Sequence, residues 1–472
     1  MYSFATDESV SPLVPRLLAD LQHRGQHAAG LTVLTPDGLH TQKRLGLVRD
    51  AIDPNPPPGR AAIGHVRYAT SGANLLQFAQ PFEQRGRHPW NHFALAFNGH
   101  LANFDALRED IKAECDTEII TQRLSQSLAG EKSPNFIGIF QQLSEQLDGA
   151  YNIAFLNAAG DMVILRDPLG IRPLCWAKNG SLFAAASESA ALANIGMPDI
   201  QSLQPGEMIL IQHNELRIER FSAINRTAHC FFEWVYFADA RSVLDDKSVA
   251  GVRAALGRSL ADQERLLGRV PIDDGTVVVP IPETARSAAV AMAHELGVPL
   301  VAGLIRNPEV GRTFIEDEER DALVRKKFSV HPNHLVGKRV LLIEDSLIRG
   351  TTLRSVLAEL REKSGASEIH VRIACPPMVA PCYYGIDIAT VDELIMAQVG
   401  ASPELLAEEL GADSLAFLPW NAVFQALGMP AERLCRGCLT GSYPTPAGQR
   451  LYHLALRERQ LPTGGAIAKS GP

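Results

Sequence analysis

The chain has few cysteines, no excess of basic residues and no long apolar run, and each of these absences argues against a class of protein. It has seven cysteines among 472 residues, an odd number that fits poorly with a disulfide framework. Lysine and arginine (45) are outnumbered by aspartate and glutamate (53), and the net charge of −8 offers no basic surface to nucleic acid. No apolar run reaches about 18 residues, and the start MYSFATDESV has no basic stretch followed by an apolar one. These absences predict a cytoplasmic protein without a membrane span or signal peptide.

What the chain does contain is typical of a large globular protein. Its hydrophobic content of 46% and charged content of 21% are ordinary for this class. A length of 472 residues exceeds what one core usually holds, so we expect at least two domains. The pattern of elements changes near residue 222. We therefore divide the chain into residues 1–222, residues 223–455 and a tail, 456–472, whose Gly and Pro content predicts flexibility.

The first part, residues 1–222, is predicted to consist of short strands with a few helices. Turns that contain Gly, Pro and Asn separate the apolar runs. The predicted strands are 61–66, 92–97, 151–157, 162–166, 182–186 and 207–213, and the predicted helices are 10–23, 117–128 and 134–146.

The second part, residues 223–455, alternates strands with helices. The predicted pairs are strand 277–282 with helix 284–296, strand 339–345 with helix 351–363, and strand 370–376 with the short helical segment 391–398. Such alternation predicts a doubly wound parallel sheet.

Residues 338–352, KRVLLIEDSLIRGTT, carry the strongest chemical signal in the chain. The apolar run 340–343 predicts a buried parallel strand, and Glu344 and Asp345 stand at its carboxyl end, where ligands bind in open α/β sheets. This acid pair can hold ribose hydroxyls or Mg²⁺. Gly350, Thr351 and Thr352 then present backbone N–H and hydroxyl donors at a helix start, which suits a phosphate.

This string resembles the loop by which type I phosphoribosyltransferases hold 5-phosphoribosyl-1-pyrophosphate (PRPP). The resemblance extends over nearly the whole chain to the amidophosphoribosyltransferase family. The strings that carry it are LQHRGQHAAG (21–30), GHVRYATSG (64–72), FNGHLANFDALRED (97–110), LRDPLGIRPL (165–174), CFFEWVYFADARSV (230–243), VPIPETAR (279–286), GRTFI (311–315) and HVRIACPPMVAPCYYGID (370–387). It implies an αββα sandwich of the N-terminal-nucleophile (Ntn) hydrolase type, followed by a phosphoribosyltransferase sheet.

The resemblance also implies roles in the transferase half. Glu344 and Asp345 would bind ribose and Mg²⁺, and the 5-phosphate would lie against a loop made of Ser346, Arg349, Gly350, Thr351 and Thr352. Glu283 and Thr284 match the loop near the pyrophosphate. Segment 306–328 looks like a mobile loop whose Arg312 and Lys326 meet phosphate charge. Glu344 departs from the family, which usually has aspartate there, but it keeps the charge.

In the glutaminase half the resemblance implies a pocket for glutamine. Arg67 matches the residue that holds the α-carboxylate, and Asp116 matches the one that holds the α-amine. Asn98 and Gly99 match the oxyanion hole. His100 stands where the family often has another residue.

The nucleophile of that half is missing from the sequence as printed. The family begins with a cysteine whose thiolate attacks the glutamine amide. Here the chain begins Met1-Tyr2-Ser3, and no cysteine precedes Cys115. Ser3 is the nearest hydroxyl, but serine is a far weaker nucleophile at neutral pH. We therefore expect glutamine hydrolysis to be absent or very slow.

The cysteines divide into two groups. One branch of the family binds a [4Fe–4S] cluster through four cysteines, and Cys230, Cys382, Cys435 and Cys438 lie in similar settings. A zinc ion would satisfy the same four thiols, and unligated thiols are the third reading. The remaining three cysteines are predicted to be buried apolar residues.

Three functions remain open at this point. The first is an enzyme of purine-type synthesis that transfers nitrogen from ammonia or another amine to PRPP, with the glutaminase half kept as a scaffold. The second is an ordinary glutamine-dependent enzyme whose N-terminus is misassigned or altered. The third is a non-catalytic regulator that binds PRPP or nucleotides. All three imply small-molecule ligands, and the resemblance suggests a homo-oligomer.

Overall fold

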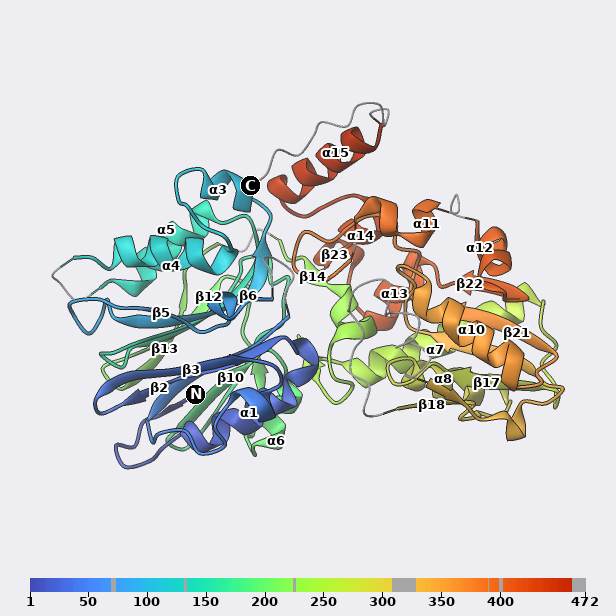
Figure 1. The fold of residues 1–472 in the computed structure, drawn as a ribbon, viewed down its shortest axis with the longest axis horizontal. Helices are drawn as coiled ribbons and strands as arrows, with labels where there is room; N and C mark the ends of the chain where they lie inside the picture. Colours follow the sequence, from blue (N-terminus) through green and yellow to red (C-terminus); the bar gives the residue numbers. More distant parts are fainter. Residues whose placement is uncertain are drawn as a thin grey trace.

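A computed structural model describes residues 1–68, 74–130, 134–223, 226–307, 328–388, 390–398 and 402–460. Figure 1 shows two halves side by side, with the N-terminal elements in blue to green and the C-terminal elements in yellow to red. Within the described residues, no helix is long and apolar enough to cross a membrane.

The N-terminal half is built around two antiparallel sheets. The first has the order β11-β9-β10-β1-β4-β2-β3, and its strands are β1 (Tyr2–Ser3), β2 (Ala28–Thr35), β3 (Gly38–Leu45), β4 (Ala61–Arg67), β9 (Cys175–Asn179), β10 (Leu182–Ala186) and β11 (Gln201–Ser202). The second has the order β13-β12-β8-β7-β6-β5, and its strands are β5 (Phe82–Gln84), β6 (Phe93–Leu101), β7 (Gly149–Asn157), β8 (Met162–Arg166), β12 (Glu207–Gln212) and β13 (Glu215–Arg220).

Helices cover the outer faces of these sheets. Against the first sheet pack α1 (Val14–Asp20), α2 (Val48–Ala51) and α6 (Ser189–Asn194), and on the side of the second sheet lie α3 (Phe104–Arg108), α4 (Asp116–Ser127) and α5 (Phe136–Gln146). Between the sheets lies an apolar layer that includes Ile63, Ala94 and Ile209. Alternation along each strand puts apolar side chains on the shared face. The predicted αββα sandwich is confirmed.

The C-terminal half contains a parallel sheet with the order β17-β20-β21-β22. Its strands are β17 (Thr276–Pro280), β20 (Arg339–Glu344), β21 (Glu368–Ile373) and β22 (Ser414–Phe417), and its longer helices are α7 (Val249–Leu267), α8 (Arg286–Leu296), α10 (Thr351–Lys363), α12 (Pro403–Leu410) and α13 (Trp420–Leu427). Residues 340–343 of β20 are fully buried, as expected for a central parallel strand.

The strand order reverses between β17 and β20. After β17 the chain passes through α8 to Leu300, which forms a parallel bridge with Val278 of β17. The chain then returns to β20 on the other side of β17 and continues through α10 to β21. Because parallel crossovers are right-handed, α8 and α10 cover opposite faces of the sheet. This confirms the doubly wound prediction and creates a switch point, where ligands bind in such folds.

Shorter elements complete the C-terminal half and the segment that leads into it. They are β14 (His229–Cys230), a π-helical turn (Glu233–Phe237), β15 (Val243–Leu244), β16 (Lys247–Ser248), β18 (Leu304–Arg306), β19 (Phe328–Val330), α11 (Ile395–Gln398), β23 (Leu434–Cys435), α14 (Gly437–Thr440) and α15 (Pro446–Gln460). The last helix, α15, continues to Gln460, so the first residues of the predicted tail, 456–460, are helical.

Candidate active site

One cavity of about 440 Å³ contains both sets of predicted site residues. From the transferase half its lining includes Glu283, Thr284, Glu344, Asp345, Ser346, Arg349, Gly350, Thr351 and Thr352, and from the N-terminal half it includes Arg67, Asn98, Gly99 and Asp116. Arg312 and Lys326 lie outside the described residues. Two pockets that the sequence predicts separately are therefore ends of one space.

The transferase end of this cavity lies at the switch point. Glu344 ends β20, and the side chain of Asp345 beyond it is buried. The Ser346 hydroxyl donates a hydrogen bond to the Asp345 carboxylate over 2.6 Å. On the neighbouring strand, the loop after β17 brings Glu283 and Thr284 to the same edge.

Gly350 shapes the turn into α10. Its φ of +79° lies in the left-handed region, and a Cβ at this position would lie 2.3 Å from Cδ1 of Ile395. Only glycine meets both conditions without displacement. Thr351 and Thr352 then begin α10, whose first N–H groups have no intrahelical acceptor and suit an anion.

Two carboxylates hold Arg349 of the same loop. Its Nε donates to Glu393 Oε2 over 3.0 Å, and its Nη2 lies 3.9 Å from Asp387 Oδ1. The other oxygen of Asp387 accepts a hydrogen bond from the Tyr68 hydroxyl over 3.0 Å. Burial, together with the nearby Asp387 charge, raises the pKa of Tyr68, so its phenol stays neutral. Tyr68 directly follows β4, so Asp387 joins the loop that contains Arg349 to the N-terminal half.

At the other end of the cavity, three elements contribute the residues predicted for glutamine. Arg67 is buried at the end of β4, and Asp116 is buried at the first position of α4. Asn98 and Gly99 lie inside β6, where they face Asn152 and Tyr151 of β7. The Asn98 amide donates to the Ser187 hydroxyl over 3.4 Å. An Asn-Gly pair often occurs because it forms a tight turn. Asn98 and Gly99 do not form one, because both lie within a strand.

His100, a departure from the family, pairs with Asp116. Its Nδ1 lies 3.0 Å from Asp116 Oδ2. Burial disfavours the imidazolium, but the close contact with the Asp116 carboxylate and its charge outweigh burial and raise the pKa of His100. Nearby, Cys115 lines the cavity, and burial raises the pKa of its thiol to about 11. This thiol is therefore protonated at neutral pH and is a poor nucleophile.

Ser3 is turned away from this cavity. Its side chain is fully buried, and its hydroxyl donates to Glu8 Oε2 over 2.6 Å. The Met1 amino group donates to the Ala62 carbonyl over 2.8 Å, and burial lowers the pKa of this amine to about 5. None of residues 1–3 is among the described residues that line the cavity. The Ser3 hydroxyl is not placed to attack a bound amide.

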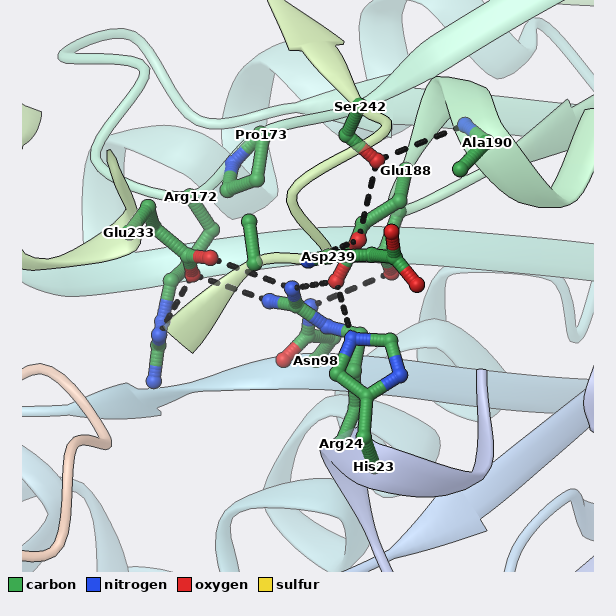
Figure 2. A network of polar contacts seen from close by, with 12 residues as sticks. His23, Arg24, Asn98, Arg172, Pro173, Glu188, Ala190, Glu233, Asp239 and Ser242 are labelled. Atoms are coloured by element: carbon green, nitrogen blue, oxygen red, sulfur yellow. Dashed lines mark hydrogen bonds and ion pairs between the residues drawn. The ribbon is translucent and has the colours of Figure 1, made fainter. Parts of the chain in front are cut away.

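A network of buried ions, which sequence reasoning missed, lies beside the cavity (Figure 2). Arg24 contacts Glu188 over 2.5 Å and Glu233 over 2.9 Å, and Arg172 contacts Glu233 over 2.8 Å. His23 adds a contact of 2.7 Å to Glu188. Burial opposes ionisation, but Arg24 outweighs it and holds the pKa of both glutamates below the usual range. Because Glu233 belongs to the segment after the N-terminal sheets, the network fixes that segment against the N-terminal half.

The four cysteines predicted as ligands line a second, smaller cavity, the cysteine cavity. Its lining comprises Ile171, Cys230, Phe231, Phe232, Cys382, Tyr384, Ile386, Ile388, Cys435, Cys438 and Tyr443. Cys230 and Cys435 are direct partners in the parallel pair β14–β23. All four thiols are free, and burial raises the pKa of Cys230 to about 12 and those of Cys435 and Cys438 well above the ordinary value. Without a cationic group the thiols of Cys230, Cys435 and Cys438 remain neutral.

The four thiols around the cysteine cavity are a donor set that a thiolate-bound cluster takes. Within the described residues, no group of three or more His, Cys, Asp or Glu side chains is arranged to hold a metal ion. A zinc ion needs its thiolates within about 2.3 Å of one point. In a [4Fe–4S] cluster each thiolate binds a different iron, so thiols placed around a cavity are what it requires.

Comparison with known proteins agrees with this architecture. A family model described as a glutamine amidotransferase domain matches residues 66–194. An amidophosphoribosyltransferase of Methanothermobacter thermautotrophicus is 37% identical over 463 residues, covering 94% of each chain, and that of Bacillus subtilis is 34% identical over 448 residues, covering 91% of this chain and 90% of its own. A solved glutamine PRPP amidotransferase from B. subtilis, complexed with ADP and GMP, superposes with a TM-score of 0.82 at 33% identity, covering 93% of this chain and 96% of that one.

Fold and site together define a phosphoribosyltransferase that carries an amidotransferase-like half in the same chain. More specifically, the chain belongs to the amidophosphoribosyltransferase family.

Proposed function

We propose that this protein transfers nitrogen to C1 of PRPP, with release of pyrophosphate, to give 5-phosphoribosylamine in a purine-type pathway. The observation that carries the proposal is the common cavity, because it joins the predicted PRPP residues to those predicted for glutamine. In a glutamine-dependent enzyme, nitrogen released at one end would have this cavity as its path to the other end.

Within this proposal the residues of the transferase end bind and orient PRPP. Gly350, Thr351 and Thr352 hold the 5-phosphate at the N-terminus of α10, and Arg349 adds charge. Glu344 and Asp345 hold the ribose hydroxyls and would bind Mg²⁺, and Glu283 and Thr284 lie near the pyrophosphate. Bound Mg²⁺ would supply positive charge to the leaving pyrophosphate. Positioning and charge therefore do most of the chemical work.

We propose ammonia or another amine as the nitrogen source of the chain as printed. The support is that Ser3 is bonded to Glu8 and that burial keeps the Cys115 thiol protonated. The residues around the glutamine pocket would then act as a scaffold.

A glutamine-dependent enzyme with a different N-terminus is the second candidate, and one observation favours it. Met1 pairs with Ala62, and from there β4 continues to Arg67. Residues preceding Met1 in the same antiparallel strand would run along β4 towards Arg67, the direction of the predicted glutamine pocket.

A paired assay tests these candidates. Purified protein with PRPP and Mg²⁺ is supplied either with ammonia at alkaline pH or with glutamine, and pyrophosphate and glutamate are measured. We expect pyrophosphate with ammonia and little glutamate. Turnover with glutamine that is comparable to turnover with ammonia would overturn the scaffold role and support the second candidate. The intact mass of the natural protein would then show whether its N-terminus differs from the printed one. PRPP binding without turnover from either donor would indicate a regulator.

For the cysteine cavity we propose a [4Fe–4S] cluster bound by Cys230, Cys382, Cys435 and Cys438. The support is that these four thiols surround a common, largely apolar space. Anaerobically purified protein should contain about four iron and about four sulfide per chain. Zinc without iron would overturn the cluster. We propose further that the enzyme is a cytoplasmic homo-oligomer, and sedimentation velocity tests the oligomer.

A further inference from the structure

Segment 382–387 runs from the cysteine cavity to the substrate cavity. Cys382 and Tyr384 line the former, and Asp387 lines the latter. Ile386 lines both cavities, as does Phe232 from the segment after β14. The two cavities therefore share lining residues, and segment 382–387 contributes to both linings.

At its first end the segment is fixed among the cysteines. The Tyr384 N–H donates to the Cys382 sulfur over 3.4 Å. The Tyr384 side chain is buried, and its hydroxyl lies 3.0 Å from the Thr445 hydroxyl, which belongs to the segment before α15. A group bound by Cys382 would fix this end further.

In its middle the segment touches the predicted oxyanion hole. Gly385 has a φ of +88°, and a Cβ at this position would lie 3.1 Å from the carbonyl oxygen of Gly99. The Gly385 carbonyl accepts a hydrogen bond from Arg172, a member of the buried ion network. The backbone of the segment therefore supports Gly99 directly, and there is no room for a side chain between them.

At its far end the segment holds the phosphate loop. One oxygen of Asp387 accepts from the Tyr68 hydroxyl over 3.0 Å, and the other lies 3.9 Å from Arg349 Nη2. Asp387 thus contacts elements from both ends of the substrate cavity.

We infer that segment 382–387 positions both ends of the substrate cavity from a single anchor in the cysteine cavity, with Gly385 and Asp387 as the positioning residues. The contacts are continuous from the Cys382 thiol to the loop that contains Arg349. Close packing around such a segment transmits a displacement from one end to the other. A displacement at the thiols therefore changes the positions of both Gly99 and Arg349. This inference rests on the proposed binding of PRPP at the loop 344–352.

The first test is Asp387→Asn, with binding of PRPP in the presence of Mg²⁺ measured by titration calorimetry. We expect affinity to fall about fivefold or more, because Arg349 loses a carboxylate that orients it. If Asp387 were only a negative charge near a polyanion, its removal would tighten binding instead. Unchanged or tighter binding overturns the positioning role.

Asp392→Asn is the matched control. It removes the same charge from a neighbouring exposed residue whose side chain pairs with Arg459 and not with Arg349. We expect wild-type affinity for PRPP. If the wild-type protein does not bind PRPP, the proposed function is wrong. If the wild-type protein binds PRPP and Asp387→Asn binds it with the same affinity, this inference is wrong.

The second test addresses the anchor through hydrogen exchange of the full-length protein. Cys382→Ala should speed exchange in peptides that contain Gly99 and Arg349, whereas Cys175→Ala, a buried thiol in β9, should not. Faster exchange confined to the cysteine cavity would overturn the anchor. Gly385→Ala is a second variant that keeps all thiols, for the case that Cys382→Ala does not fold. It should speed exchange in the peptide that contains Gly99. An exchange rate equal to that of the wild type in this peptide would contradict the inference.

Discussion

The two ends of the substrate cavity are built in different ways. At the transferase end, a single strand, loop and helix supply most of the residues, all within 344–352. At the opposite end, Arg67, Asn98 and Asp116 come from β4, β6 and α4, and the buried ion network next to them joins residues far apart in the chain. A local motif preserves its geometry through its own turn, whereas the other end depends on how the whole half is packed. The predictions below test this difference.

The largest effect is expected from breaking the ion network. Arg24→Met leaves Glu188 and Glu233 buried with one cationic partner fewer. We expect the free energy of unfolding to fall by about 3–5 kcal/mol, because the remaining partners, Arg172 and His23, only partly compensate the buried carboxylates. Denaturant unfolding measures it. Arg269→Met, which breaks an exposed pair with Glu404 at 3.5 Å, should cost less than about 1 kcal/mol, and equal losses would contradict the special role of the network.

The second prediction concerns the local motif. Asp345→Asn should lower ammonia-dependent kcat/KM for PRPP by about 100-fold, because the charge that we propose to bind ribose or Mg²⁺ is lost while the buried strand is kept. Steady-state pyrophosphate release measures this change. Asn98→Ala, at the other end, should leave the ammonia reaction within about twofold of wild type. Similar losses in both variants would mean that the ends do not work separately.

The third prediction separates backbone strain from steric fit in the loop. Gly350→Ala and Gly411→Ala both place alanine at a positive φ, +79° and +82°, which costs each about 1 kcal/mol. Only the Cβ at position 350 meets a neighbour, Ile395, whereas nothing lies within 4 Å of the other. We therefore expect a several-fold rise in KM for PRPP in Gly350→Ala alone, measured at saturating ammonia. A similar rise in KM in both variants would mean that backbone strain at a positive φ, and not the contact with Ile395, causes the effect.

The smallest effect concerns pH and the glutamine end. Pairing with Asp116 raises the pKa of His100, so folding gains stability when this histidine is protonated. The gain is fully present below the ordinary histidine pKa of about 6.5 and is lost as pH rises through the higher folded value. His100→Asn should therefore be less stable than wild type at low pH, by on the order of 1 kcal/mol or less, and equal to it at alkaline pH. Unfolding curves from pH 5.5 to 9 measure this difference in the free energy of unfolding. A difference that increases with pH would contradict the raised pKa of His100.

The secondary structure was largely readable because its signals are local. Helix α10 and strands β8 and β10 begin and end at the predicted residues 351–363, 162–166 and 182–186. The prediction omitted α7, although Val249, Val252, Leu256 and Leu260 follow helical spacing and are buried. It also omitted the hairpin β2–β3, whose β3 carries mostly polar side chains and lacks an apolar alternation.

The candidate site divides in the same way. The cavity-lining residues within 344–352 could be singled out because strand, acid pair, glycine and helix start are adjacent in the chain, and resemblance to relatives singled out those at the opposite end. Neither could show that both groups line one cavity, or that Arg24 meets Glu188 and Glu233, 164 and 209 residues away.

The sequence by itself determined the two-part fold and the strand, turn and helix start within 338–352, and it singled out the cysteines at 230, 382, 435 and 438, since each follows from local pattern or resemblance. Only the tertiary structure decided that Ser3 turns towards Glu8, that His100 pairs with Asp116 and that segment 382–387 touches both cavities. The reason is physical: hydrogen bonds and ion pairs between distant residues depend on which surfaces the packed core brings together, and no short-range pattern encodes that choice.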